Sequence, residues 1–409
     1  MFTLSIDQLV DIAVKMARDV REGLRREGAD ILCIPTFIPL SRSPEPGRVL
    51  AIDVGGTNAR CALVALEKGN RFSVKKGPIK TKIPVTRGIP LDRNTFLGTL
   101  EDILQQLAPP AGLPVGYCFS YPARPEPDGD AIILKWTKAL FVRDSIGEKA
   151  GRMLRDYINR TDPGRMGSSI KVINDAVAAL LAGLPDSKAG AHIGLIAGSG
   201  SNMAMLLPAA HIPKLTQPLR QSVSLPVNME SGNFHPPHLT RWDDALDAAS
   251  DNPTQQRLEK AVSGVYLPYL FKMARPESEV NPELGSAALF QKAFAEPSPP
   301  DEKSAAEAEI ALQLIQRSAS LIAAALAGAI SILVNATAAD RVTITAEGGL
   351  FHAHPRYRAI TTATLETLLS SMGMAEIHAE IQTVTDANLK GCAMAGLAKP
   401  PGSSCRVST

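Results

Sequence analysis

The stretch 51–60, AIDVGGTNAR, constrains the fold of this chain more than any other segment. An apolar run reaches Asp53, Gly55 and Gly56 follow, and a second apolar run begins at Cys61. This pattern predicts a strand, a tight turn and an antiparallel return strand. Adjacent glycines let the backbone approach a ligand closely and offer N–H groups to an anion. Asp53 suits Mg²⁺, directly or through water. An ordinary Gly-Gly hairpin is the alternative interpretation.

A second glycine turn of the same kind lies further along the chain. The apolar runs 192–197 and 203–207 bracket the residues Gly198, Ser199 and Gly200. Two such hairpins in one α/β chain suggest a duplicated architecture in which a nucleotide is held between similar halves.

Composition excludes several classes of function. The 409 residues carry a formal net charge of +2, with scattered basic residues, six Tyr and two Trp, which argues against nucleic acid as a partner. The five cysteines are widely spaced without a C-x-x-C motif, so they predict free thiols in a reducing cytoplasm rather than disulfides or a zinc site. The N-terminus does not have the pattern of a signal peptide.

One segment requires a test for membrane spanning. The run 318–339 contains no charged residue, but it is rich in Ala, Ser and Gly. These small residues favour a buried helix over a membrane span. We therefore expect no membrane partner.

Hydrophobic spacing predicts most of the other elements. Helices are expected at 4–28, 96–107 and 148–159, in a block over 254–335 with a surface excursion at 276–300, and from 355 onward. Strands are expected through 48–84 and at 115–120, 171–173 and 341–345, with a loop at 122–130. The strand at 171–173 leads to Asn174, Asp175 and an Ala-rich helix.

These motifs, in this order, resemble the eukaryotic-type hexokinase family of the actin-like ATPase superfamily. The resemblance rests on AIDVGGTNAR, GYCFSYP (116–122), ILKWTKAL (133–140), VINDAVAAL (172–180), GLIAGSGSNMAML (194–206), VNMESGNF (227–234), TQQRLEKAVSGVYL (254–267) and ITAEGGLFHAHPRY (344–357). It covers most of the chain. The W-T-K, N-D and Q-Q-x-x-E-K stretches carry most of its specificity.

The resemblance implies a two-lobed α/β protein of the actin-like ATPase (ribonuclease H-like) fold with an interlobe cleft. The small domain is expected at 46–174 plus 390–409, and the large domain at 1–45 plus 175–389. The implied activity is ATP-dependent phosphorylation of the 6-hydroxyl of a hexose, with glucose favoured, and ATP and Mg²⁺ as the nucleotide and metal. The protein is expected to be a monomer or a homodimer.

Asp175 is the candidate general base, because a residue between a strand and a helix can project a carboxylate from the edge of a sheet. Its alternative role is that of a helix-capping residue. Lys138 is implied as a second catalytic residue that neutralises charge near the transferred phosphoryl group. The substrate-binding residues implied by the family are Ser120, Thr137, Lys138, Asn174, Asp175, Asn202, Glu230, Gln256 and Glu259.

For the nucleotide, the resemblance implies contacts from residues of both glycine turns and from the glycines of the adenosine motif. These are Asp53, Gly55, Gly56, Thr57, Asn58, Arg60, Gly198, Ser199, Gly200, Gly348 and Gly349, with Asp53 assigned to Mg²⁺. Arg60 has an alternative role, since it could pair with an acidic residue instead of phosphate.

The sequence departs from the family pattern after the first large-domain glutamate, where Ser231 replaces a common aromatic residue. This leaves open a kinase for mannose, fructose or an amino sugar. A sugar-sensing regulator without turnover is a further alternative, although Asp175, Lys138 and the glycines of the first turn are all present. An actin-like assembly ATPase is disfavoured, because it would not need the polar segments 133–140 and 227–267.

Overall fold

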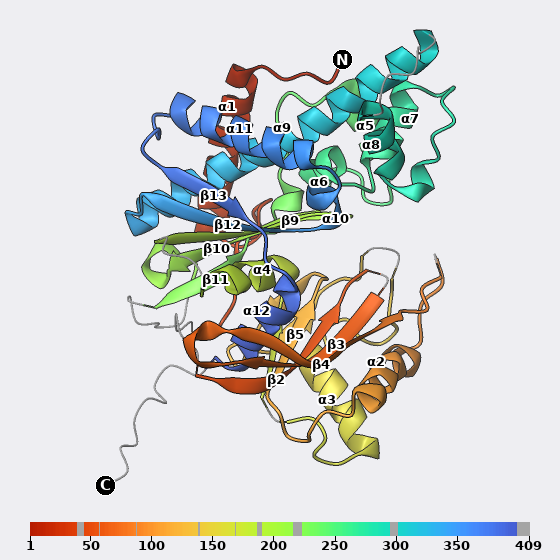
Figure 1. Cartoon of the computed structure of the whole chain (residues 1–409), viewed down its shortest axis with the longest axis vertical. Coiled ribbons are helices and arrows are strands. Elements are labelled where there is room, and N and C mark those ends of the chain that lie inside the picture. The colour runs from red at the N-terminus through yellow and green to blue at the C-terminus, as the bar shows by residue number, and fades with distance from the viewer. Residues whose placement is uncertain are drawn as a thin grey trace. The chain divides into compact units, whose positions relative to one another are not determined.

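The computed structural model describes residues 1–38, 45–56, 58–86, 88–137, 140–167, 169–185, 190–215, 223–294 and 302–398. The chain forms two compact units (Figure 1). Unit 1 comprises Met1–Cys33, Ala189–Pro218 and Met229–Thr383, and unit 2 comprises Ile34–Lys188, Leu219–Asn228 and Val384–Thr409. Unit 2 thus contains the segments predicted for the small domain together with 34–45, 175–188, 219–228 and 384–389.

The sheet of unit 2 has the strand order β4-β3-β2-β5-β8. Its strands are β2 (Gly47–Val54), β3 (Asn58–Leu66), β4 (Phe72–Lys82), β5 (Val115–Phe119) and β8 (Ile170–Ile173). β2, β3 and β4 are antiparallel, whereas β2, β5 and β8 run parallel. The predicted first hairpin is confirmed, and its register places Asp53 opposite Arg60.

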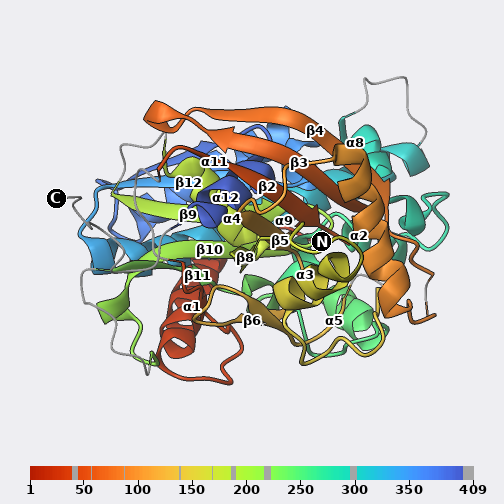
Figure 2. The ribbon, with the colours of Figure 1, turned by 90° about the horizontal axis from the view of Figure 1, so that it is seen from below.

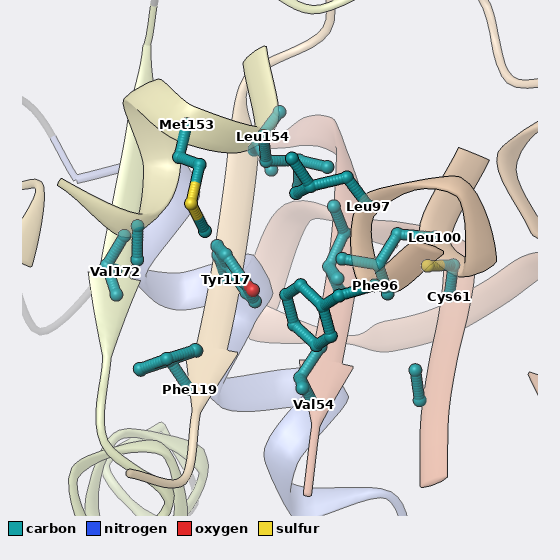
Figure 3. Packing of buried hydrophobic residues seen from close by; sticks show 14 of the residues in the cluster. Val54, Cys61, Phe96, Leu97, Leu100, Tyr117, Phe119, Met153, Leu154 and Val172 are labelled. Carbon is teal, nitrogen blue, oxygen red and sulfur yellow. The ribbon is translucent and has the colours of Figure 1, made fainter. Parts of the chain in front are cut away.

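Helices cover both faces of this sheet (Figures 1 and 2). On one face α2 (Arg93–Leu107) and α3 (Ala150–Thr161) pack apolar side chains against the strands, as Figure 3 shows for Phe96, Leu100 and Leu154. The predicted helix at 96–107 begins at Arg93, because the Asp92 side chain accepts hydrogen bonds from the first free N–H groups. On the other face α12 (Ala387–Gly396) contacts β2, β5 and α4 (Asp175–Gly183).

Shorter elements complete unit 2. β6 (Ala123–Pro125) and β7 (Ala131–Ile133) form an antiparallel pair, so the segment predicted as a loop at 122–130 contains a short strand. β1 (Ile34–Pro35) pairs with β11 (Ser224–Asn228), and η1 (Lys68–Asn70) follows β3.

In unit 1 the strands β10 (Ser201–Pro208), β9 (Ala191–Ala197), β12 (Arg341–Glu347) and β13 (His378–Gln382) lie side by side in this order. β9 and β10 are antiparallel and form the predicted second hairpin, whereas β9, β12 and β13 are parallel. β13 is not predicted by the sequence pattern, since its largely polar side chains lack the apolar alternation of a half-buried strand.

The helices of unit 1 include the predicted amphipathic helix, α1 (Ile6–Arg25), which a Ser5 capping box starts. The expected helical block contains α6 (Arg257–Val262), α7 (Leu267–Ala274), η4 (Pro282–Leu284), α8 (Ala287–Phe294) and α9 (Glu302–Thr337). The remaining helices are η2 (Ala209–His211), η3 (Ser231–Asn233), α5 (Arg241–Ala248), α10 (Gly349–His352) and α11 (Pro355–Ser371).

By length and composition alone, α9 is the one helix among the described residues that could cross a membrane, but 78% of its most apolar window is buried inside the protein. It contacts α1, α8 and α11. At Gly328, an added Cβ would lie 2.5 Å from the Ala13 carbonyl oxygen, so α1 and α9 approach closely there. Packing within unit 1 therefore accounts for the uncharged run 318–339, in agreement with the predicted buried helix.

Candidate active-site residues

The first glycine turn joins β2 to β3 in unit 2. The Gly55 N–H donates to the Asn58 carbonyl at 2.9 Å, which closes the turn. The Tyr121 hydroxyl donates to the Gly55 carbonyl at 2.7 Å and holds the turn from the side. Gly55, Gly56 and Asn58 are half-buried, and Thr57 lies outside the described residues.

One carboxylate oxygen of Asp53, at the end of β2, accepts hydrogen bonds from an arginine and from an asparagine side chain. Its Oδ2 accepts from Arg60 Nε at 2.8 Å and from Asn388 Nδ2 at 3.2 Å. Arg60 Nη1 also donates to Asp386 at 3.3 Å. Burial lowers the pKa of Arg60, but the two neighbouring carboxylates outweigh it and raise that pKa. The alternative role foreseen for Arg60, pairing with acidic residues, is thus present, while its contact with phosphate stays a prediction.

Asp386 and Asn388 belong to the beginning of α12, far from Asp53 in the sequence. The sequence reading did not select them, because only the packing of α12 against β2 and β5 brings them to the first glycine turn. No local motif at 384–390 points to this placement.

The parallel strands β2, β5 and β8 bring two predicted residues, Ser120 and Asn174, to one edge of the sheet. Val54 pairs with Phe119 and Cys118 with Ile173, so Ser120 and Asn174 each follow a neighbouring strand end. The Ser120 N–H donates to the Val54 carbonyl at 3.1 Å. Ligands of open α/β sheets bind beyond these carboxyl ends.

Asn174 and Asp175 begin α4. The Asn174 side chain caps the helix by accepting from the Ala176 N–H at 2.9 Å, and Asp175 is the first helical residue. Asp175 Oδ1 accepts from the same N–H at 2.9 Å. Asn174 is thus the N-cap residue, Asp175 shares its N–H donor, and the half-buried Asp175 carboxylate stands at the positive end of the helix dipole.

The W-T-K stretch is anchored by its tryptophan. Trp136 packs edge-on against Phe119 and Tyr121, and its Nε1 donates to Ser145 Oγ at 2.8 Å. Thr137 follows it and is half-buried, whereas Lys138 lies outside the described residues.

A small pocket in unit 2 lies beside these residues. Its polar lining comes from Thr36, Asn174 and Asn228, and Phe119 and Tyr121 supply aromatic walls. Asn174 therefore both caps α4 and faces a hollow at the carboxyl edge of the sheet.

In unit 1, the predicted sugar-binding residue Asn202 connects the motif 194–206 to the motif 227–234. Its Oδ1 accepts from the Met203 N–H at 2.7 Å and from the Ser231 N–H at 3.1 Å. Glu230, immediately before Ser231, adopts a left-handed backbone with φ 54°. Ser231 and Phe234 are fully buried, which places the residue that departs from the family pattern inside the protein.

Glu259, on α6, lies against the second glycine turn. Its Oε2 accepts from the Ser201 N–H at 2.9 Å and its Oε1 from Gln256 Nε2 at 3.1 Å. A Cβ on Gly200 would lie 2.7 Å from Oε2, so a side chain at 200 would displace the carboxylate. The structure thus brings predicted phosphate-binding and sugar-binding residues together within unit 1.

The two glycine motifs of unit 1 meet at the carboxyl ends of β9 and β12. The Gly198 N–H donates to the Gly200 carbonyl at 2.9 Å, and Ser199 is exposed. Gly348 has φ 115°, and a Cβ there would lie 2.4 Å from the Ala197 carbonyl oxygen. Only glycine satisfies both conditions. Gly349, which begins α10, is exposed and has open space where a Cβ would stand.

Across the described ranges, no group of three or more His, Cys, Asp or Glu side chains is arranged to hold a metal ion. A carboxylate such as that of Asp53 is the kind of donor that Mg²⁺ uses when nucleotide phosphates and water complete its shell.

Two family models, both described as hexokinase, match the chain. The first matches residues 1–184, and the second matches 192–277 and 271–398. The chain belongs to the hexokinase family. The predicted resemblance is thereby confirmed.

Relatives support the hexokinase assignment. Hexokinase HKDC1 of Homo sapiens is 28% identical over 90% of this chain and 44% of its own length. Hexokinase-7 of Oryza sativa subsp. japonica is 32% identical over 64% of this chain and 58% of its own length. This hexokinase chain thus spans about half the length of the curated relatives it matches.

A solved structure titled "Hexokinase from Schistosoma mansoni complexed with glucose" is 21% identical, covers 97% of this chain and 96% of its own, and has a TM-score of 0.82. The likeness confirms the predicted α/β fold, which is the two-lobed actin-like kinase fold of hexokinases.

Proposed function

We propose that this hexokinase transfers the γ-phosphoryl group of ATP to the 6-hydroxyl of a hexose, with glucose as the preferred sugar. The observation that carries the proposal is the position of Asp175 at the start of α4, next to the N-cap residue Asn174 and after the carboxyl end of the parallel strand β8. The hexokinase of known structure whose title names glucose supports that sugar as the first choice.

Phosphoryl transfer to an alcohol needs positioning, charge neutralisation and an acceptor for the hydroxyl proton. We assign the last role to Asp175. Proton transfer late in a loose transition state requires only a modest base, so a carboxylate suffices. Lys138 is assigned to charge neutralisation.

Hexoses differ in the direction of their hydroxyl groups, so selectivity depends on oriented donors and acceptors. We assign this function in unit 2 to Ser120, Thr137 and Asn174. In unit 1 we assign it to Asn202, Glu230, Gln256 and Glu259. The hydrogen bonds to Asn202 and Glu259 support their assignments, because they fix the side chains that recognition requires.

For ATP, we assign the phosphates to the two glycine turns and the adenosine to Gly348 and Gly349. Asp53 is assigned to Mg²⁺, which neutralises phosphate charge when bound. The hydrogen bonds from Arg60 and Asn388 fix the orientation of the Asp53 carboxylate, one residue before the end of β2.

The test is ADP release with ATP and Mg²⁺ over glucose, mannose, fructose, glucosamine and N-acetylglucosamine. Wild-type protein is expected to turn over glucose fastest. Asp175→Asn should lose a factor of about 10²–10⁴ in kcat, the usual contribution of a positioned acid–base group.

The matched control is Asp156→Asn, which changes an aspartate of α3 whose side chain is 54% exposed and pairs with surface arginines. It should retain wild-type turnover. Near-normal turnover by folded Asp175→Asn would contradict the assigned base. A wild-type protein that binds sugar but releases no ADP would indicate the regulator instead.

A further inference from the structure

The segment 249–256 joins α5 to α6 in unit 1 and leads directly to Glu259. Two of its residues have left-handed backbone that side chains disfavour, Thr254 with φ 68° and Gln256 with φ 52°. Backbone of this kind persists only where surrounding contacts hold it. The contacts that hold this segment therefore determine where Gln256 and Glu259 stand.

Asp247, near the end of α5, supplies the central contact. Its Oδ2 accepts from the Thr254 N–H at 2.8 Å and from Arg257 Nη1 at 3.0 Å, while its Oδ1 accepts from Lys260 Nζ at 2.6 Å. Asp247 is 4% exposed and Lys260 2% exposed. Removal of one member of so buried a pair leaves the other charge uncompensated.

Lys260 continues the connection toward the candidate site. Its Nζ also donates to the Asn252 carbonyl at 2.8 Å, and Asn252 Nδ2 donates to Gln256 Oε1 at 2.5 Å. Gln256 Nε2 then donates to Glu259 Oε1 at 3.1 Å. Hydrogen bonds of the Asn252 backbone and of the Asn252 and Gln256 side chains thus connect the buried ion pair to the carboxylate of Glu259.

The other oxygen of Glu259 is oriented from the second glycine turn, because Oε2 accepts from the Ser201 N–H. The carboxylate therefore accepts from the Ser201 N–H on one oxygen and from the Gln256 side chain on the other. A carboxylate oxygen can accept more than one hydrogen bond, so this arrangement is compatible with a ligand hydroxyl.

We propose that Asp247 and Lys260 are positioning residues, which fix the carboxylate of Glu259 in the orientation that a sugar hydroxyl requires. The sugar-binding part of this inference rests on the proposed function. The reaction rate is sensitive to small displacements of binding groups, since a displacement of about 1 Å can lower the rate on the order of 10²-fold.

The experiment compares Asp247→Asn, which removes the charge and keeps the size, with Lys292→Met. Lys292, whose side chain is 34% exposed, forms an ion pair with the buried Glu307 between α8 and α9, outside segment 249–256. Glucose Kd is measured by calorimetry, and KM is measured for glucose and for ATP. We expect glucose Kd and KM to rise about tenfold in Asp247→Asn, with KM for ATP changed less than about threefold. Lys292→Met should change none of them by more than about twofold.

A double variant tests whether Asp247 acts through Glu259. If it does, adding Asp247→Asn to Glu259→Gln should lower kcat/KM for glucose by less than about threefold beyond Glu259→Gln alone. Fully additive losses would overturn the inference, as would an unchanged glucose Kd in folded Asp247→Asn. Should Asp247→Asn fail to fold, Lys260→Arg replaces it, with the same criteria for KM and additivity.

Amide hydrogen exchange separates this inference from the proposed function, because it needs no sugar. Asp247→Asn should speed exchange over 249–262 by about tenfold relative to Lys292→Met, since the strained backbone loses its anchor. Unchanged exchange would overturn the positioning role even in an active enzyme. Wild-type protein that neither binds nor phosphorylates any hexose would overturn the proposed function, whatever the exchange shows.

Discussion

Replacing Gly391 by alanine tests how closely α12 packs on α4, the helix that begins with Asp175. A Cβ at 391 would lie 2.3 Å from the Ala178 carbonyl oxygen and 2.6 Å from the Ala178 Cα. Both atoms belong to the backbone of α4, so no rotation of a side chain can relieve the contact. The two helices must move apart.

The magnitude follows from two opposing effects. Alanine gains about 1 kcal/mol over glycine in a helix interior. Restoring ordinary van der Waals separation needs a shift of about 1 Å, and overpacking of this kind costs about 3 kcal/mol when backbone must move. The net loss in the free energy of unfolding is therefore about 2 kcal/mol, or a Tm about 4–8 °C lower for a unit of this size.

Thermal unfolding of Gly391→Ala, followed by fluorescence and paired with kcat for glucose, checks this value. Gly98→Ala is the matched control, because Gly98 is also helical and its added Cβ would meet only the Tyr157 hydroxyl, at 3.4 Å. This control should melt at or slightly above the wild-type temperature. A Gly391→Ala protein that melts as high as Gly98→Ala would refute the close packing of α12 on α4.

Two further predictions concern the buried charges of unit 1. Arg317→Met should lower the free energy of unfolding in urea by about 3–5 kcal/mol, because it leaves the buried Asp243 carboxylate without its counter-charge and without the two hydrogen bonds from Arg317, of 2.7 and 2.9 Å. Arg71→Met removes an ion pair whose arginine is 78% exposed, so it should lower the free energy of unfolding by less than about 1 kcal/mol. Equal losses of stability in Arg71→Met and Arg317→Met would contradict the role of burial. Burial raises the pKa of Asp243, but the neighbouring Arg317 outweighs it, so the folded pKa lies below the unfolded one. Stability from this carboxylate is then fully present above the unfolded pKa of about 4 and is lost as pH falls toward the folded pKa. In urea titrations from pH 5 to pH 3, the free energy of unfolding should decline less for Asp243→Asn than for wild type. An identical decline in the two proteins would contradict the lowered pKa of Asp243.

The local sequence was sufficient to predict elements that depend on interactions between residues close together in the chain. The apolar period and the Ser5 capping box predict α1, and the glycine turns between apolar runs predict both hairpins. The pair Asn174–Asp175 similarly marks the start of α4, since a capping side chain acts on N–H groups within its own first turn.

Elements with weak local patterns could not be found in this way. β13 lies at the edge of its sheet with largely polar side chains, so its strand conformation follows from pairing with β12 rather than from hydrophobic alternation. β6 within the expected loop is likewise defined by its pairing with β7.

The sequence by itself therefore determined the family, the fold class and the candidate chemical groups, because these reside in short ordered motifs. Tertiary structure alone decided the partners of those groups. Asn388 reaches Asp53 and Asp386 reaches Arg60 only through the packing of α12, and Asp247 reaches Lys260 only through the fold of the segment 249–256. The physical reason is that hydrogen bonds and ion pairs depend on distances between atoms, and chain folding sets those distances for residues that are remote in sequence.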